Sequence, residues 1–313
     1  MDELTRDLGN AVHAIDTRMG GYDGITAGYL LLAERPCLVE TGTALSAPVV
    51  RTALASLGLT ERDLATVVVT HIHLDHAGGV GDIAALYPEA QVVVHERGAR
   101  HLVDPARLVA SARMVYGDVL DEMFGALRPT DSSRVRAIND GDVIELGGGR
   151  RLTACYSPGH AQHHVGLQDS ASGDLYVGDA AGIYIPEKAM VRPSTPPPDF
   201  DLVKALDSLE KFRALQPTRL LFSHFGPVDA VDETLDRSAE ELRLWVDLVR
   251  DARASALDLD HAVTMVREKT ADRYADLLAD PDVDEKFEKL NATAANIAGI
   301  NRWLDHLADA RGD

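Results

Sequence analysis

Short apolar runs rich in β-branched residues, broken by glycine and polar turns, recur from residue 12 to residue 222. They predict strands at residues 12–15, 27–32, 37–40, 65–70, 91–95, 143–146, 152–156, 164–168, 175–177 and 219–222. Between them, apolar positions at helical spacing predict helices at residues 47–57, 80–87, 108–124 and 202–215, the last capped by Asp199 or Asp201. The turns Glu34-Arg35-Pro36 and Ser172-Gly173-Asp174 are expected to close hairpins. This alternation predicts an α/β protein whose sheets are covered by helices.

The pattern changes after the last predicted strand. Glycine almost vanishes, and apolar residues recur at helical spacing, as in Ile297, Ile300 and Trp303. We therefore divide the chain into a mixed α/β part, residues 1–230, and an all-helical extension, residues 231–313. The apolar stripe of the extension must be buried against the rest of the chain or, in a homodimer, against a second copy.

The segment between the predicted strands at residues 175–177 and 219–222 begins without the hydrophobic periodicity of a helix or a strand. Residues 183–192 are too irregular for a helix or a strand, and a proline-rich stretch follows at residues 193–198. We interpret this segment as a long loop that could shape a substrate pocket.

Composition narrows the class of protein. Cys37 and Cys155 lie in apolar runs, which is typical of buried thiols in a reducing compartment. Residues 1–10 lack the basic-then-apolar order of a secretion signal, and no apolar run approaches the roughly 18 residues of a membrane span. The net charge of −19 disfavours nucleic acid and anionic membranes as partners. We expect a cytoplasmic protein that acts on a small molecule.

The sharpest chemical signal directly follows the predicted strand at residues 65–70. In the run Thr70-His71-Ile72-His73-Leu74-Asp75-His76, three imidazoles and one carboxylate fall within six residues. Alternation places His71 and His73 on one side of an extended segment, and Asp75 and His76 follow as the chain turns. Neutral imidazole and carboxylate groups suit zinc, iron or manganese. This spacing indicates a metal site, rather than a polar loop that happens to be rich in histidine.

Three later motifs also follow predicted strands: Ser157-Pro158-Gly159-His160, Gly178-Asp179 and Ser223-His224-Phe225-Gly226. Together with the histidine-rich run they resemble the metallo-β-lactamase superfamily, in particular its glyoxalase II-like and lactonase-like dinuclear hydrolases. The resemblance covers residues 12–227. It implies that residues 1–230 form a catalytic domain with the four-layer αβ/βα sandwich of that superfamily.

The resemblance also implies a ligand set and a chemistry. It assigns the first metal to His71, His73 and His160, the second to Asp75, His76 and His224, and a bridging role to Asp179. The metals are expected to be two zinc ions, with iron or manganese as alternatives. The implied reaction is hydrolysis of an ester-like bond, a thioester or lactone ahead of a β-lactam or phosphodiester, by a hydroxide that bridges the metals. Asp75 would orient this hydroxide as a catalytic residue.

Five further residues are singled out, His164, Tyr184 and Glu40 by comparison with the family and His163 and Arg192 from the local sequence. His164 is expected to support a ligand, whereas His163, its neighbour in an extended run, should point to the opposite face. Tyr184 is a candidate for binding the substrate carbonyl, and Arg192 for binding a substrate carboxylate. Glu40 stands where the family commonly has aspartate.

Two other functional classes remain open. Relatives that oxidise persulfides use one iron on ligands equivalent to His71, His160 and Asp179, so an oxidoreductase is one alternative. A non-catalytic binding protein on the same fold is the other. Because every predicted ligand precedes residue 231, we also expect metal binding to persist in a chain truncated after Ala230.

Overall fold

The computed structural model describes residues 4–311. The chain divides into two compact units, and each is built from several segments. One, the sandwich unit, runs to Tyr156 and continues with His163–Gly178 and Pro217–Asp229. The other, the helical unit, combines Ser157–Gln162 and Asp179–Gln216 with the chain from Ala230 onward. The helical unit thus contains two earlier segments besides the extension expected from residue 231.

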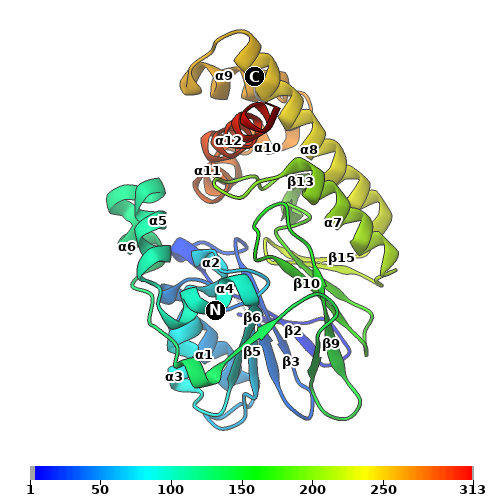
Figure 1. Cartoon of the computed structure of the whole chain (residues 1–313). Helices are drawn as coiled ribbons and strands as arrows, with labels where there is room; N and C mark the ends of the chain where they lie inside the picture. Colours follow the sequence, from blue (N-terminus) through cyan, green and yellow to red (C-terminus); the bar gives the residue numbers. More distant parts are fainter. Residues whose placement is uncertain (1–3, 312–313) are drawn as a thin grey trace. The chain divides into compact units, whose positions relative to one another are not determined.

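The sandwich unit contains two β-sheets, whose central strands are visible in Figure 1. The seven-stranded sheet has the order β1-β2-β3-β4-β5-β6-β7, with β1 Thr5–Asp7, β2 Val12–Asp16, β3 Ala27–Leu31, β4 Cys37–Val39, β5 Thr66–Val68, β6 Gln91–His95 and β7 Val135–Ile138. The six-stranded sheet has the order β15-β14-β11-β10-β9-β8, with β8 Val143–Glu145, β9 Arg151–Tyr156, β10 Val165–Asp169, β11 Leu175–Gly178, β14 Leu220–Phe222 and β15 Gly226–Val228. Each strand predicted from the sequence has a counterpart here.

The strands of these sheets that the sequence did not predict, β1, β7 and β15, all lie at sheet edges. An edge strand needs no continuous apolar run, and β15 even contains Pro227, which is tolerated there because one side of the strand has no ladder to complete. Both predicted hairpins are present, since β3 pairs antiparallel with β4 and β10 pairs antiparallel with β11.

Alternating side chains of the central strands fill two separate cores. Leu30 and Val67 face a core shared with the helices, whereas Tyr29 and Val68 face the core shared with the six-stranded sheet, which contributes residues such as Leu221. All of these side chains are at most 1% exposed. Because the central strands are covered on both faces, they appear in the sequence as unbroken apolar runs.

The helices of the sandwich unit are α1 Ala47–Ser56, α2 Leu74–Ala77, α3 Val80–Leu86, α4 Glu96–Val103, α5 Ala106–Tyr116 and α6 Leu120–Phe124. The prediction of one helix at residues 108–124 is wrong in one respect, because the structure has two helices there. The chain breaks at Gly117, whose φ of 58° is left-handed, so α5 ends and α6 begins after a short turn. Helix α4 was not predicted, because polar residues and a glycine make up most of its short sequence.

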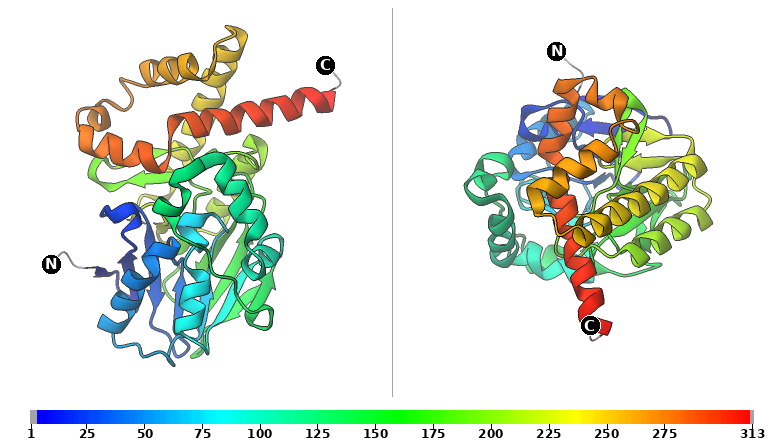
Figure 2. Two further views of the ribbon diagram at one scale, coloured as in Figure 1. Left: turned by 90° about the vertical axis from the view of Figure 1, so that its left-hand side faces the viewer. Right: turned by 90° about the horizontal axis from the view of Figure 1, so that it is seen from above.

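The helical unit contains α7 Leu202–Ala214, α8 Val231–Ala254, α9 Leu259–Lys269, α10 Ala275–Leu278, α11 Pro281–Leu290 and α12 Thr293–Arg311. Helix α7 begins at Asp201, whose side chain accepts hydrogen bonds from the Val203 and Lys204 amides. Helix α12, red in Figure 2, packs against α8 and α9. Its predicted apolar stripe is therefore buried within its own unit, with Ile297 and Ile300 fully buried.

The segment at residues 183–192 is not the irregular loop that the sequence suggested. Strands β12 Ile183–Ile185 and β13 Met190–Arg192 form an antiparallel hairpin across a short turn. Three residues are too few for a strand period to be read from the sequence. The stretch at residues 193–196 has no regular structure.

Among residues 4–311, no helix combines the length and the apolar character needed to cross a lipid bilayer.

We predict that Leu221→Ala lowers the free energy of unfolding by about 2–5 kcal/mol, because Leu221 is fully buried between the two sheets and its removal leaves a cavity. Urea denaturation followed by circular dichroism measures the change. The matched control is Leu45→Ala, since Leu45 is 52% exposed and its truncation should change stability by less than about 0.5 kcal/mol. Equal losses in the two variants would contradict the assignment of Leu221 to the core.

Candidate metal centre

Five predicted ligands of the sandwich unit lie just beyond the ends of two strands. His71 and His73 follow β5, and the chain then enters the short helix α2, which carries Asp75 and His76. His224 follows β14. The carboxyl ends of the buried strands thus deliver imidazole and carboxylate groups from distant parts of the sequence to one place.

Asp75, His76 and His224 form a compact group whose ligand-type atoms all lie within 4.8 Å of one another. The Nε2 atoms of His76 and His224 are 3.1 Å apart. One Asp75 oxygen lies 3.5 Å from His76 Nε2 and 3.3 Å from His224 Nε2. His224 Nδ1 is 2.8 Å from the Ile25 carbonyl oxygen, which can only accept, so Nδ1 carries the proton and Nε2 presents its lone pair.

His76 Nε2, the Nε2 lone pair of neutral His224 and an Asp75 oxygen face one another. The lone pair and the carboxylate repel unless a cation or an extra proton lies among the three atoms. A divalent metal ion satisfies all three atoms at once. The donor set therefore fits the metal that the sequence predicted at this position.

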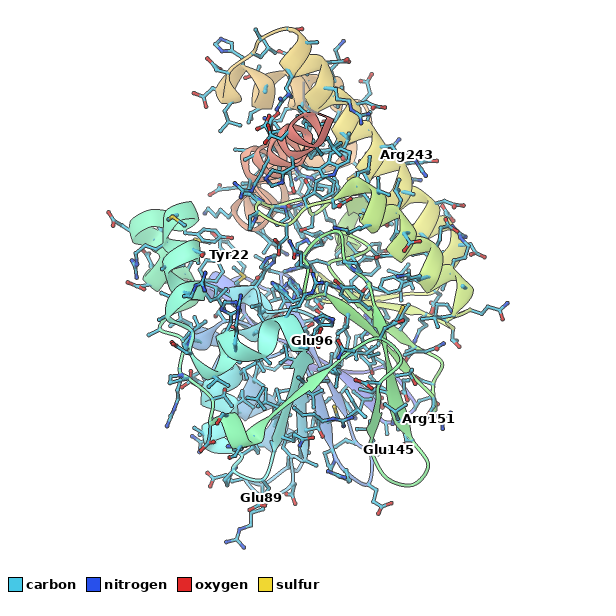
Figure 3. The ribbon with its side chains drawn as sticks, in the orientation of Figure 1. Tyr22, Glu89, Glu96, Glu145, Arg151 and Arg243 are labelled. Carbon is cyan, nitrogen blue, oxygen red and sulfur yellow. The ribbon has the colours of Figure 1, made fainter. Side chains whose placement is uncertain are left out.

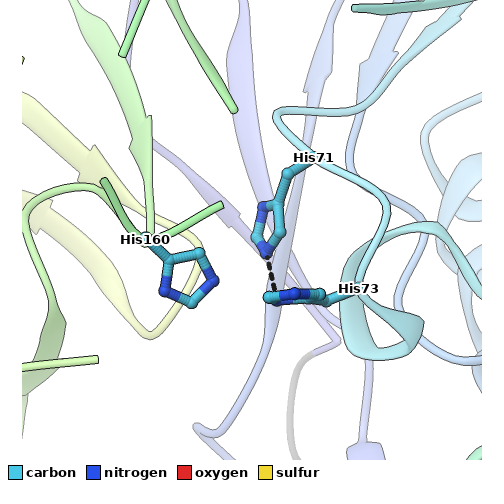
Figure 4. A group of neighbouring side chains, drawn as sticks. All are labelled: His71, His73 and His160. Atoms are coloured by element: carbon cyan, nitrogen blue, oxygen red, sulfur yellow. Dashed lines mark hydrogen bonds between the residues drawn. The ribbon is translucent and has the colours of Figure 1, made fainter. Parts of the chain in front are cut away.

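His71 and His73 form a second pair, drawn in Figure 4 together with His160 of the helical unit. His71 Nε2 lies 3.1 Å from His73 Nδ1. On the other side of the ring, His71 Nδ1 is 3.0 Å from the Thr70 hydroxyl, which itself donates to Glu40 Oε1 at 2.5 Å. The hydroxyl is thereby left to accept from His71 Nδ1–H, so His71 also presents an Nε2 lone pair to its neighbour.

Glu40 ties the two ligand-bearing loops together. Its carboxylate is buried, and Oε1 accepts hydrogen bonds from the backbone amide and hydroxyl of Thr70 and from the hydroxyl of Ser223, at 3.1, 2.5 and 3.3 Å. Thr70 directly precedes His71, and Ser223 directly precedes His224. The other oxygen lies 3.7 Å from His76 Nδ1. From the sequence, Glu40 could be identified only as a departure from the family pattern. Its contacts could not be predicted, because all of them are with residues far away in the chain.

The two histidines that precede β10 both lie against the ligand rings. His164 is fully buried, with its ring centroid 5.0 Å from that of His71, in keeping with the supporting role expected for it. Gly178 leaves room for this ring, because a Cβ atom there would lie 2.4 Å from His164 Nε2.

The expected orientation of His163 is wrong. Its ring stacks on His71 at 6.1 Å with an interplanar angle of 11°, and its Nδ1 accepts the Ile72 amide at 3.4 Å. Strand alternation does not apply to His163, because β10 begins only at Val165 and the preceding residues form a turn.

The remaining two predicted ligands form a pair in the helical unit. His160 Nε2 lies 3.6 Å from Asp179 Oδ2, and both residues are at most 4% exposed. His160 Nδ1 donates to the Ser194 carbonyl oxygen at 3.0 Å, which turns the Nε2 lone pair toward the carboxylate. The Ser194 hydroxyl donates to Asp179 Oδ2 at 3.2 Å.

Asp75 is suited to stay ionised. Burial alone would raise the pKa of Asp75, but in the metal-free chain the positive charge of a protonated His76 and the hydrogen bonds that His224 and His76 then donate to the carboxylate outweigh burial and hold this pKa well below its usual value of 3.8. Its side chain keeps 17% of its surface exposed, so the carboxylate is accessible.

The two predicted substrate residues lie on the β12–β13 hairpin. Tyr184 is partly exposed, and burial raises the pKa of its hydroxyl. Arg192 is buried, with Nη2 3.0 Å from Glu288 and its guanidinium 5.6 Å and 5.5 Å from the rings of Trp245 and Tyr274. This ion pair supports a structural role for Arg192 and disfavours the predicted contact with a substrate carboxylate.

The family of the chain follows from its sequence and its fold. Residues 22–224, more than half of the chain, match the sequence profile of the metallo-β-lactamase superfamily. The chain belongs to this superfamily. The crystal structure of its archaeal member ST1585 has a TM-score of 0.63 at 27% identity and covers 76% of this chain and 86% of its own. The structure of TTHA1429 from Thermus thermophilus, 22% identical, has a TM-score of 0.64 and covers 90% and 89%. The predicted fold class, the αβ/βα sandwich followed by carboxyl-terminal helices, is confirmed.

Three curated relatives are similar to this chain over different lengths. ST1585 of Sulfurisphaera tokodaii is 31% identical over 58% of this chain and 70% of its own length. The human acyl-coenzyme A thioesterase MBLAC2 is 32% identical over 36% of this chain and 39% of its own. The N-acyl homoserine lactonase AttM of Azorhizobium caulinodans is 25% identical over 50% and 51%. The chain thus spans about half or less of the two relatives whose names state an activity.

We predict that Glu40→Ala lowers the free energy of unfolding by about 3 kcal/mol, because it leaves three buried donors without their acceptor. Thermal denaturation of the metal-free protein measures this loss. Glu145→Ala is the control, because Glu145 is exposed and pairs across the strands with Arg151, both labelled in Figure 3. It should change stability by less than about 0.5 kcal/mol. A Glu40→Ala protein as stable as this control would show that Glu40 does not join the two loops.

Proposed function

We propose that this chain is a dinuclear metal-dependent hydrolase that cleaves an ester-like bond in a small molecule. The observation that carries the proposal is the group in which His76 and His224 turn their Nε2 atoms to each other beside Asp75. A protein without a metal has no reason to keep such a buried cluster, because it is costly unless a cation neutralises it. Membership of a metal-dependent superfamily supports the same conclusion.

We assign the metals as the family pattern implies. His71, His73 and His160 would hold one ion, Asp75, His76 and His224 the other, and Asp179 would bridge them. Zinc suits this nitrogen and oxygen donor set, and iron and manganese are the alternatives. When bound, two such ions lower the pKa of a water molecule toward neutrality and polarise a carbonyl oxygen.

Asp75 is the residue of the chain that we propose as catalytic. A bound cation would keep the carboxylate ionised, and its partial exposure lets it meet a substrate. The oxygen that does not face His76 and His224 can accept a proton from water and pass it to the leaving group. Burial of the surrounding imidazoles keeps bulk water from competing for this proton.

A thioester or a lactone is the substrate class that we favour. The similarity to a thioesterase and to a lactonase supports this choice, although each covers half of the chain or less. The proposed bridging carboxylate of Asp179 makes β-lactam cleavage less favoured. The net charge of −19 argues for a small-molecule substrate rather than for nucleic acid or a membrane surface.

The one-iron oxidoreductase is the main alternative. It would use only His71, His160 and Asp179, and the group formed by Asp75, His76 and His224 would have no function. The close packing of that group therefore favours the hydrolase. A binding protein without activity would likewise leave an ionised, accessible carboxylate unused.

A hydrolysis screen with elemental analysis tests the proposal. Metal-replete protein is offered thioesters, lactones, phosphodiesters and β-lactams, and bound metals are counted on the same preparation. Two zinc ions per chain with thioester or lactone turnover would support the proposal. One iron with oxygen uptake on a persulfide, or no turnover with any class, would refute it.

We predict that Asp179→Ala lowers the affinity for both metals and nearly abolishes turnover, because a shared carboxylate neutralises two cations at once. The loss should exceed the roughly 10- to 100-fold typical of residues that only hydrogen-bond to ligands. Metal content after dialysis against a chelator is the readout. Two metals retained at a near-normal rate would rule out the bridging assignment.

A second prediction compares two histidines. His76→Ala should remove one metal and most activity, because it deletes a ligand. His163→Ala should keep both metals but weaken their binding, by about 10-fold, because the ring of His163 packs on His71 and its Nδ1 accepts the Ile72 amide. Zinc titration of the two metal-free variants separates these effects. Loss of a whole site in His163→Ala, or no effect at all, would contradict the arrangement.

A further inference from the structure

Ser194 contacts both proposed ligands of the helical unit. Its carbonyl oxygen accepts the Nδ1–H of His160 at 3.0 Å, and its hydroxyl donates to Asp179 Oδ2 at 3.2 Å. The first contact fixes the tautomer of an imidazole, and the second orients a carboxylate. One residue therefore sets the donor atoms of two ligands.

The segment that carries Ser194 has no regular structure, so its position must come from its contacts. On one side of Ser194, the Asn291 amide donates to the Pro193 carbonyl oxygen at 2.9 Å. On the other side, Asn296 Oδ1 accepts from the backbone amide of Thr195 at 2.6 Å and from its hydroxyl at 3.0 Å. The Asn296 amide also donates to Asn291 Oδ1 at 2.7 Å, which links the two contacts.

These contacts lie in the interior of the helical unit. Thr195, Asn296 and Asn291 are 0%, 1% and 7% exposed. A buried amide that both donates and accepts cannot be replaced without leaving polar groups unsatisfied. The network therefore specifies one position for residues 193–195.

Helix α12 also supports this segment by direct contact. A Cβ atom at Gly299 would lie 1.9 Å from the Thr195 carbonyl oxygen and 2.7 Å from the Pro196 carbonyl carbon. Both are backbone atoms, so a larger side chain would displace the segment itself. Glycine destabilises the interior of a helix. The close approach of residues 195 and 196 explains why glycine is present at position 299.

We infer that α12 is a positioning element for the metal centre: through Asn296 and Gly299 it fixes residues 193–195, and Ser194 then orients His160 and Asp179. The inference rests on the proposed function, because it takes His160 and Asp179 as ligands. It reverses the expectation that metal binding persists without the helical extension. All ligands precede residue 231, but the residues that align two of them follow it.

The test is zinc binding by the full chain, measured on metal-free protein by competition with a chromophoric chelator. Asn296→Ala and Gly299→Ala should each weaken zinc binding by roughly 10- to 100-fold. Asn301→Ala is the matched control, the same substitution five residues along α12, where the side chain contacts the exposed Arg253. It should bind zinc as the wild type does. Circular dichroism before titration establishes that each variant is folded.

Substitutions of Ser194 test the inference at a second position, outside helix α12. Ser194→Ala removes the hydrogen bond to Asp179 and should weaken zinc binding, whereas Ser194→Thr retains a hydroxyl and should restore it. A general loss of stability would not be rescued in this way. This pair also keeps the inference testable if a variant of α12 fails to fold.

The outcomes separate the inference from the proposed function. Folded Asn296→Ala and Gly299→Ala proteins that bind two zinc ions with wild-type affinity would overturn the inference and leave the function intact. Weakening in Ser194→Ala alone would overturn the role of α12 but support that of Ser194. A wild-type chain that binds no zinc, iron or manganese would refute the proposed function and the inference with it.

Discussion

Electron pairs that face one another inside a protein must share a cation or a proton, and this constraint governs the sandwich unit. In its neutral form His224 donates its Nδ1 proton to a backbone carbonyl, so its Nε2 presents a lone pair, 3.1 Å from His76 Nε2 and beside the Asp75 carboxylate. The same logic applies to His71, whose Nδ1 is engaged by Thr70. The rings of His71, His160 and His224 are each held from behind by a hydrogen-bond partner that selects which nitrogen faces the centre.

The rest of the fold serves to hold these atoms against their mutual repulsion. Two apolar cores fix the central strands, so the loops that leave β5 and β14 start from rigid positions. Glu40 then joins the two loops by accepting hydrogen bonds from residues directly before His71 and His224. In the helical unit, Ser194 contacts His160 and Asp179 and so holds these two proposed ligands in place. Glu40 has the corresponding role for the ligands of the sandwich unit. The chain therefore uses backbone and side-chain acceptors far from the ligands in sequence to set their geometry.

What could be predicted from the sequence depended on signals that are local. The strands buried on both faces were readable as apolar runs, and the run from His71 to His76 indicated a metal site because its spacing is compact. The superfamily resemblance supplied His160, Asp179 and His224, which lie too far apart for a spacing argument. The orientation of His163 could not be read, because alternation ends at the turn before β10. Nor could the roles of Glu40, Ser194 and Asn296 be predicted, since their contacts span 15 to 183 residues of chain.

X-ray absorption at the zinc edge of the metal-loaded chain is the most direct test of the central claim. The account predicts nitrogen and oxygen ligands at about 2.0–2.2 Å with several imidazole rings, and a second metal at about 3.5–4 Å. A spectrum with sulfur at about 2.3 Å, or with no metal neighbour in fully loaded protein, would contradict it.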